Sequence, residues 1–370
     1  MGELDKRRLV RTLQELVRID SSRDIGRMSD YVEKKLDEIG FKVIRDSDSN
    51  LVSEIGMGEG FLLNAHLDTV KADWKGALSG TVRNGRVYGR GSSDCKAGVA
   101  AMLEIANFLR EKELDNRVVF AFTGNEENKP LEINGAYKLV KKISARRGIV
   151  LEPTTREDGS IEIAIGCKGS YRFNIDALGK RCHSGYPERG ENAIYNACSF
   201  ISEFKKIRLP HTKIKDIGKV TATASITQIY AKEGANVIPG RCSVTVDYRA
   251  LPEEEESEIT KKVRRICIET LGRKYKLTKL SGIQGDLYQD KEFLDECKKS
   301  IVGVGAVPKV YFSRGRNDSG VFHKYGGIGC YVIGPGTHGQ AHKINEYCDI
   351  AGLLKTTEAV LKIVEEYAVQ

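Results

Sequence analysis

Long apolar segments are absent from this chain of 370 residues. No stretch approaches the roughly 18 uninterrupted apolar residues that a membrane-spanning helix requires. The N-terminal segment Met1–Leu9 also lacks the apolar region of a secretory signal peptide. We therefore expect a cytoplasmic protein with no membrane partner.

Cysteine pairs of the kind that bind zinc are missing as well. The chain has nine cysteines, but none stands in a Cys-x-x-Cys pattern, and the closest two are Cys167 and Cys182. In a reducing cytoplasm most of them are expected to be small, buried apolar side chains. A zinc site built from Cys-x-x-Cys pairs is therefore not predicted.

Signals for nucleic-acid and nucleotide binding are weak. Lysine and arginine exceed aspartate and glutamate by 8, and this excess is spread along the chain rather than gathered in a basic patch, so no nucleic-acid partner is predicted. The segment Gly89-Arg90-Gly91 lacks the third glycine of a dinucleotide fingerprint, and no Gly-Lys-Ser/Thr follows it. A tight turn that leads into a helix is sufficient to explain these glycines.

The length of the chain favours two domains, because a single hydrophobic core usually stops growing beyond roughly 250–300 residues. Strand and helix patterns alternate up to about Gly166 and again near the C-terminus, which predicts an α/β fold with a mostly parallel sheet. Between them, the order strand, helix, strand, strand, helix, strand indicates a ferredoxin-like α+β domain. We expect residues 1–166 and 281–370 to form one domain and residues 167–280 to form an inserted second one.

Two local patterns in the first region are clear. Asn84-Gly85 stands between two short apolar runs, which is typical of a type I′ β-hairpin. The apolar run Phe61–Ala65 is too short for a helix and indicates a buried parallel strand. It leads into His66 and Asp68, which should point the same way because strand side chains alternate between faces. We expect them at the sheet edge where ligands bind in α/β proteins.

Further acidic and histidine side chains follow predicted strands or stand in nearby loops: Asp94, Glu126, Glu127, Glu152 and His342. Singly, each has an ordinary interpretation, such as a helix N-cap for Asp94 or a solvated pair for Glu126-Glu127. Together, two imidazoles and several carboxylates suit zinc, cobalt or manganese. Because buried carboxylates without counter-charge are very costly, two cations balance the set better than one.

Five segments also carry a specific resemblance. In this order and over nearly the whole chain, they resemble the signature blocks of the M20 metallopeptidase family: Ala65–Val70, Gly91–Gly98, Glu126-Glu127, Leu151–Pro153 and His342. That family includes acetylornithine deacetylase, succinyl-diaminopimelate desuccinylase and aminoacylase. The resemblance implies that residues 1–166 and 281–370 form the catalytic, metal-binding domain. It further implies that residues 167–280 form a lid through which relatives dimerise.

The resemblance implies a metal ligand set. His66 and Glu152 would bind one zinc ion, Glu127 and His342 would bind a second, and Asp94 would bridge the two. Cobalt or manganese are expected substitutes for zinc.

Catalytic roles are implied for three further residues. Asp68 would fix the ring and tautomer of the metal-binding histidine. Glu126 would be the general base for a metal-bridged hydroxide and would return the proton to the leaving amine. His183 resembles the lid histidine that, in dimeric relatives, reaches the partner's site and stabilises the oxyanion. As an isolated loop histidine, it would more often be a surface residue.

Substrate contacts are expected from the lid and from one loop. Asn236 and Arg249 lie in segments that look like lid segments of the family, and Arg249 is a candidate for binding a substrate carboxylate. The loop that contains Arg314 and Arg316 departs from the family's glycine- and threonine-rich pattern. Arginines pair with carboxylates in bidentate fashion, so either one is a candidate clamp for an acid group, although a solvent-facing loop is almost as good an interpretation.

The leading functional hypothesis is a metal-dependent amidohydrolase of amino-acid biosynthesis that cleaves N-acylated amino acids, of the acetylornithine deacetylase or succinyl-diaminopimelate desuccinylase type. In the family, glutamate at the position of Glu152 goes with deacylases, whereas di- and tripeptidases tend to carry aspartate there. The alternatives are an acetyl-lysine deacetylase, a di- or tripeptidase, a carboxypeptidase, and a catalytically silent metal-binding relative. The expected partners are a small N-acyl amino acid or short peptide and a second copy of the chain.

Overall fold

The computed structural model describes residues 4–127 and 130–369. The chain divides into two compact units. The first unit runs up to Gly166 and includes Leu287–Phe312 and the chain from Asn317 onward, while the second comprises Cys167–Asp286 and Ser313–Arg316. Residues 281–286 and 313–316 thus group with the second unit, whereas the sequence analysis had placed them in the first. The reason for 281–286 is that the last strand of the second unit continues to Ile283, which pairs with Ser170.

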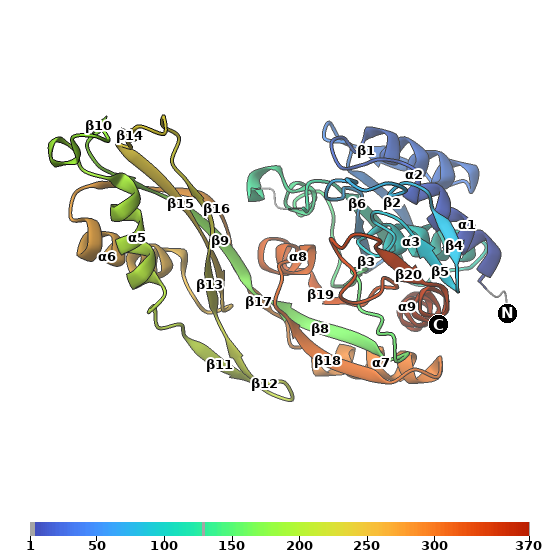
Figure 1. Ribbon diagram of the computed structural model, residues 1–370. Helices are drawn as coiled ribbons and strands as arrows, with labels where there is room; N and C mark the ends of the chain where they lie inside the picture. Colours follow the sequence, from blue (N-terminus) through green and yellow to red (C-terminus); the bar gives the residue numbers. More distant parts are fainter. Residues whose placement is uncertain (1–3, 128–129, 370) are drawn as a thin grey trace. The chain divides into compact units, whose positions relative to one another are not determined.

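The first unit is built on a mixed sheet with the strand order β1-β2-β6-β3-β7-β19-β8-β17, in which β18 also pairs with β8 (Figure 1). The strands β6, β3, β7 and β19 at its centre are parallel, whereas β1, β2 and β8 are antiparallel to their neighbours. The bounds are β1 Val43–Arg45, β2 Leu51–Ile55, β3 Gly60–His66, β6 Arg117–Thr123, β7 Arg147–Val150, β8 Ile161–Cys167, β17 Asp286–Leu287, β18 Pro308–Ser313 and β19 Gly329–Val332. The prediction of a mostly parallel α/β sheet is confirmed.

Helices cover both faces of this sheet, which explains why β3 is apolar along its length. Leu62 packs in a cluster with Leu139 and Phe322, on one face. The ring of Phe61, on the opposite face, contacts Phe293 and Tyr367. The helices are α1 Lys6–Val17, α2 Gly26–Glu38, α3 Lys96–Leu109, α4 Gly135–Leu139, α7 Lys291–Gly303, α8 Asp318–Gly326 and α9 Ile350–Ala368.

A small antiparallel sheet of β4 Thr81–Arg83, β5 Arg86–Tyr88 and β20 Tyr347–Asp349 completes the first unit. The turn between β4 and β5 has φ of +50° at Asn84 and +71° at Gly85, as a type I′ hairpin requires. Because β20 pairs with β5, the C-terminal segment that follows His342 lies beside the segment that leads to Asp94.

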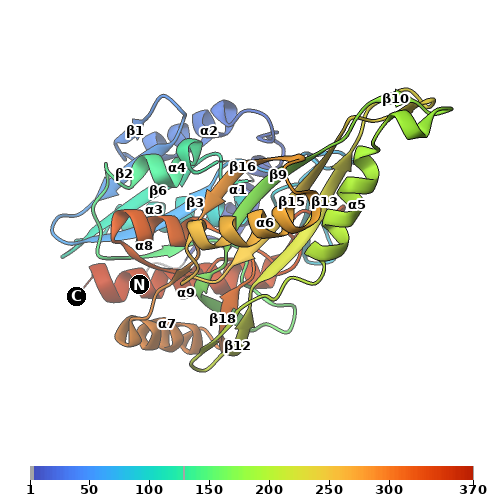
Figure 2. The same cartoon turned by 90° about the vertical axis from the view of Figure 1, so that its left-hand side faces the viewer.

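The second unit is an antiparallel sheet with the order β13-β15-β9-β16, against which α5 and α6 pack (Figure 2). Its elements are β9 Gly169–Leu178, β10 Cys182–His183, α5 Ala193–Phe204, β11 His211–Ile214, β12 Gly218–Thr221, β13 Thr223–Tyr230, β14 Val237–Ile238, β15 Arg241–Ala250, α6 Glu256–Leu271 and β16 Tyr275–Ile283. This is the predicted ferredoxin-like arrangement. The second strand of the predicted order is instead preceded by a separate hairpin, β11–β12, and the chain leaves this hairpin at Ala222 to form β13.

Within the described ranges, no helix has the length and apolar character needed to cross a membrane.

Candidate active site

His66 lies buried at the end of β3, and its two ring nitrogens face different partners. Its Nδ1 is 2.9 Å from the main-chain oxygen of Asp68, and its Nε2 is 2.9 Å from Oδ1 of Asp94. Because a carbonyl oxygen only accepts, Nδ1 carries a hydrogen, and Nε2 faces the acidic side chains, where either a proton or a cation must lie between them. An imidazole held in this tautomer is ready to bind a cation through Nε2.

The carboxylate of Asp68 anchors the next loop. It accepts hydrogen bonds from the main-chain N–H groups of Glu126 at 3.2 Å and Glu127 at 3.1 Å. Its Oδ1 is 3.7 Å from Nδ1 of His66, so the main-chain oxygen of Asp68, rather than its carboxylate, makes the closer contact with the ring. Burial works against ionisation, but His66 and the two N–H groups keep the pKa of Asp68 below its usual value.

The second histidine mirrors the first. Nε2 of His342 is 2.9 Å from Oε1 of Glu127 and 3.5 Å from Oδ2 of Asp94. The two oxygens of Asp94 therefore face two different imidazoles, His66 through Oδ1 and His342 through Oδ2. Oε1 of Glu152 is 3.6 Å from Nε2 of His66. The five predicted metal ligands therefore lie close together although they come from separate segments. Each contacts the next in the spatial order Glu152, His66, Asp94, His342, Glu127.

The charges in this cluster are strongly coupled. Burial, followed by the nearby carboxylates of Asp94 and Glu126, raises the pKa of Glu152 well above its usual value. Burial opposes protonation of His66, but Glu152 and the other acidic groups around the ring, Asp68 and Asp94 among them, together outweigh it and raise the pKa of that imidazole. The hydrogen bond to Glu127 raises the pKa of His342. The cluster therefore holds extra protons unless cations replace them, and a set of imidazole and carboxylate donors fits zinc, cobalt or manganese.

A cleft of about 370 Å³ lies beside the cluster. Its lining includes Asp68 and Glu127 together with Ser21, Arg23 and Lys71. Hydroxyl, cationic and carboxylate groups at one concave surface suit a small polar ligand. The cleft is therefore a polar binding space that two residues of the predicted site, Asp68 and Glu127, help to line.

Glu346 is a functional residue that the sequence analysis missed. Its buried carboxylate accepts hydrogen bonds from the main-chain N–H groups of Gly91 at 3.1 Å, Ser93 at 2.9 Å and Asp94 at 3.0 Å, and from Nη1 of Arg90 at 2.7 Å. One side chain therefore holds the loop that presents Asp94. Its position four residues after His342 is the only signal in the sequence, and it does not reveal a partner 256 residues away.

Replacing Glu346 with alanine should lower the free energy of unfolding by about 3–5 kcal/mol, because it takes away the buried partner of Arg90. It also removes the acceptor for three main-chain N–H groups. Urea unfolding followed by circular dichroism measures the change. Glu203→Ala, which removes an exposed ion pair with Lys206, is the matched control and should cost less than about 1 kcal/mol. Equal losses for the two variants would contradict the anchoring role of Glu346.

Asp318, at the N-terminus of α8, is a second buried carboxylate without an assigned role in the sequence analysis. It accepts hydrogen bonds from Oγ1 of Thr123 at 3.0 Å and Nδ2 of Asn134 at 2.9 Å. Its charge contributes to the raised pKa of Glu152. Asp318 therefore adds to the negative potential that a cation would neutralise.

The remaining predicted residues belong to the second unit, where His183 lies on the short strand β10 and Asn236 directly precedes its partner strand β14. His183 is exposed on β10, opposite Val237 of β14, and its Nδ1 accepts a hydrogen bond from the N–H of Gly185 at 3.0 Å. The main-chain oxygen of Asn236 accepts from Ser184 N at 2.8 Å. His183 and Asn236 are therefore neighbours, and their catalytic and substrate-binding roles stay predictions.

Two of the predicted arginines of the second unit, Arg249 and Arg314, lie near a buried lysine. Burial, then the charges of Arg314 and Arg249, lowers the pKa of Lys168. Arg249 also donates from Nε to Asp247 at 2.6 Å. Arg316 is half-buried in the same short segment as Arg314. This group of cations is suited to an anionic ligand, and its use for substrate stays a prediction.

Comparison with known proteins agrees with the family resemblance noted in the sequence. Residues 62–366 match Peptidase family M20/M25/M40. The chain is 30% identical to acetylornithine deacetylase of Myxococcus xanthus over 277 residues, which cover 69% of this chain and 70% of the relative. It is 27% identical to succinyl-diaminopimelate desuccinylase of Dinoroseobacter shibae, with 91% and 92% of the two chains covered.

Solved structures show the same fold. The M20 family metallo-carboxypeptidase Sso-CP2 from Sulfolobus solfataricus superposes with a TM-score of 0.82 at 18% identity, covering 97% of this chain and 99% of that one. Aminopeptidase PepT from Bacillus cereus superposes with a TM-score of 0.77 at 23% identity, covering 99% and 100%. Because the family match extends over most of the sequence and includes each predicted metal ligand, the chain belongs to peptidase family M20/M25/M40.

Proposed function

We propose that this hydrolase uses two zinc ions to cleave the amide bond of N-acylated amino acids. The observation that carries the proposal is the position of Asp94, whose two carboxylate oxygens face two different histidines. A carboxylate placed between two imidazoles can bind two adjacent cations, one through each of its oxygens. Cobalt and manganese are the expected substitutes, since the same donors suit them.

Each ion would be held by one histidine and one glutamate in addition to the shared aspartate. His66 and Glu152 would hold one ion, and His342 and Glu127 the other. The ions would supply Lewis-acid chemistry, because they polarise the amide carbonyl and make water more acidic. The main-chain oxygen of Asp68 holds the ring of His66 in the tautomer that leaves Nε2 available.

Glu126 would move the proton. Its side chain is buried next to Glu152, and its main-chain N–H is anchored by the carboxylate of Asp68. A carboxylate oxygen of Glu126 would take a proton from the attacking water and give it to the nitrogen of the leaving amine. Anchoring matters here because a general base must lie within hydrogen-bond reach of the proton that it takes.

Three features support an acylated amino acid as substrate. The similar curated proteins carry the names of a deacetylase and a desuccinylase. The cations Arg249 and Arg314 gather near Lys168, where they suit a substrate carboxylate, with Arg316 and Asn236 as further contacts. The glutamate at position 152 is the residue that the family's deacylases carry. A peptidase or carboxypeptidase remains the alternative, because solved structures with this fold bear those names.

The substrate class is tested with a panel of N-acetyl and N-succinyl amino acids, dipeptides and tripeptides. The protein is stripped of metal and then loaded with zinc, cobalt or manganese. We expect the highest kcat/KM for an N-acyl amino acid and no turnover before metal is added. Faster cleavage of di- or tripeptides would support the peptidase alternative, and no cleavage of any compound with bound metal would indicate a silent relative.

We also propose that the protein is a cytoplasmic homodimer that pairs through its second unit. β13 is an edge strand of that sheet, and Ile229 and Tyr230 near its end are exposed. An edge strand with exposed apolar side chains is a ready template for pairing with another strand. A second copy of the chain would cover it, and His183 would then act in the partner's site.

Replacing His183 with alanine should lower kcat about 10²–10³-fold, the usual effect of losing one donor to the oxyanion. The metal content should not change, because the ligands all belong to the first unit. Steady-state kinetics and elemental analysis measure the two quantities separately. His211→Ala changes an exposed histidine of the same unit and should leave both unaltered. Unchanged turnover in His183→Ala would mean that this histidine has no role in catalysis.

A further inference from the structure

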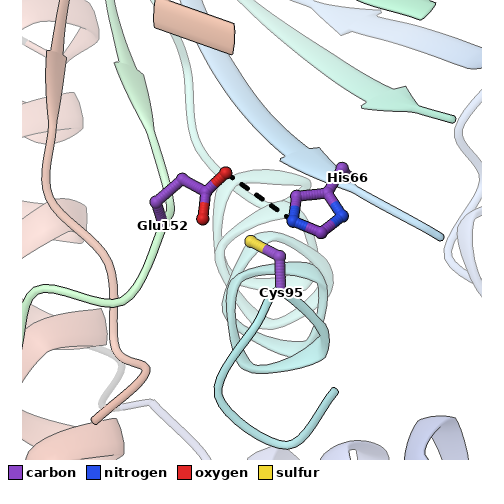
Figure 3. Close-up of side chains that lie close together, drawn as sticks. All are labelled: His66, Cys95 and Glu152. Atoms are coloured by element: carbon purple, nitrogen blue, oxygen red, sulfur yellow. Dashed lines mark ion pairs between the residues drawn. The ribbon is translucent and has the colours of Figure 1, made fainter. Parts of the chain in front are cut away.

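Cys95 lies against the metal centre and has no part in the mechanism above. It directly follows Asp94, is fully buried, and is the N-cap residue of α3. Its Sγ, one ring nitrogen of His66 and one carboxylate oxygen of Glu152 all lie within 4.8 Å of one another. Figure 3 shows the sulfur directed towards the space between the His66 ring and the Glu152 carboxylate. A soft donor is therefore present beside two predicted ligands of the same ion.

The position of this sulfur is set by close packing. The thiol of Cys95 donates to the main-chain oxygen of Leu151 at 3.0 Å, one residue before Glu152. Gly98 also lies against this contact. A Cβ atom added to it would be 2.4 Å from the main-chain oxygen of Leu151 and 3.1 Å from Sγ of Cys95. The first turn of α3 reaches Leu151 this closely because residue 98 is glycine. The sulfur is thus held in place before any ion binds.

We propose that Cys95 is a ligand of the ion held by His66 and Glu152, which makes that position selective for thiophilic metals. On binding, the S–H bond breaks, a sulfur–metal bond forms, and the proton passes to solvent. A site with thiolate, imidazole and carboxylate donors favours zinc, cobalt and cadmium over manganese and magnesium. The proposal rests on the proposed metal centre, but it does not depend on the amide reaction.

Cys348 offers a matched comparison. It is also buried in the first unit, and its thiol also donates to a main-chain oxygen, that of Pro335, at 3.3 Å. Among the described residues, no group of metal-binding side chains includes Cys348. A serine at position 348 therefore controls for the loss of a buried thiol that does not face the centre.

The test is the absorption spectrum of the full-length protein, stripped of metal and then loaded with cobalt(II). A cysteine thiolate bound to cobalt gives an intense sulfur-to-cobalt charge-transfer band in the near ultraviolet, whereas histidine and carboxylate ligands do not. We expect the band in the unmodified protein and in Cys348→Ser, and its loss in Cys95→Ser at equal cobalt content. Cadmium affinity should fall at least about tenfold in Cys95→Ser, whereas manganese affinity should change less than about threefold.

Two results would overturn the proposal. One is a cobalt-loaded unmodified protein without the band, which needs no variant and so does not depend on the folding of Cys95→Ser. The other is a band that persists in both Cys95→Ser and Cys95→Ala. The readout also separates this proposal from the proposed function. A band without hydrolysis of any amide would leave Cys95 as a ligand and reject the reaction, whereas hydrolysis without a band would reject Cys95 alone.

Discussion

Glu126→Gln should lower kcat about 10²–10⁴-fold while leaving the bound metal in place. Glutamine keeps the size of the side chain but cannot accept the proton of the attacking water. The five side chains proposed as ligands are untouched, and the main-chain N–H of Glu126 can still donate to Asp68. Steady-state kinetics on the best substrate of the panel, together with elemental analysis, measures the effect.

The control for this variant is Glu132→Gln, which changes an exposed glutamate in the same connection between β6 and α4. It should retain full turnover. If Glu126→Gln hydrolyses the substrate at the unmodified rate, Glu126 is not the general base, and another carboxylate near Glu152 must take that role. Loss of metal together with turnover would instead assign Glu126 to the ligands.

Asp94→Ala should release both ions and abolish turnover. Asp94 faces both His66 and His342, so its removal takes a donor from each position. Affinity for zinc should fall at least about 100-fold at both positions, since even residues that only support ligands change it 10- to 100-fold. Titration with a chelating dye measures the two affinities.

A non-bridging ligand should behave differently. His342→Ala removes a donor from only one position and should leave one ion bound, whereas Asp73→Ala, an exposed aspartate of the same unit, should leave both. Asp94→Ala with one tightly bound ion would mean that the two positions do not share this carboxylate. Circular dichroism of each variant shows whether the fold is retained.

Much of the fold is encoded in short-range patterns. Three features depend only on neighbouring residues and could be predicted without a structure: the apolar run of β3, the Asn84-Gly85 turn, and the order of strands and helices in the second unit. The convergence of the five proposed metal ligands was predictable for a related reason. His66, Glu127 and Glu152 stand at or just after the ends of parallel strands, and the order of all five resembled that of a known family.

Other features depend on which distant segments meet. Glu346 holds the Asp94 loop across 252 residues of sequence, and the sulfur of Cys95 approaches Glu152 only because α3 packs on Leu151. The composition predicts that most cysteines are small, buried apolar side chains. The neighbouring residues do not show that the thiol of Cys95, unlike that of Cys348, faces the metal centre.

The sequence alone therefore determined the elements, their order and the chemistry of the residues at the strand ends, because period and residue type are local properties. Only the tertiary structure decided which atom of Asp68 contacts His66, that each oxygen of Asp94 faces a different histidine, and that a thiol joins the cluster. The physical reason is that hydrogen bonds and metal ligation depend on distances of a few ångströms between side chains. Those distances are set by the packing of segments far apart in the chain.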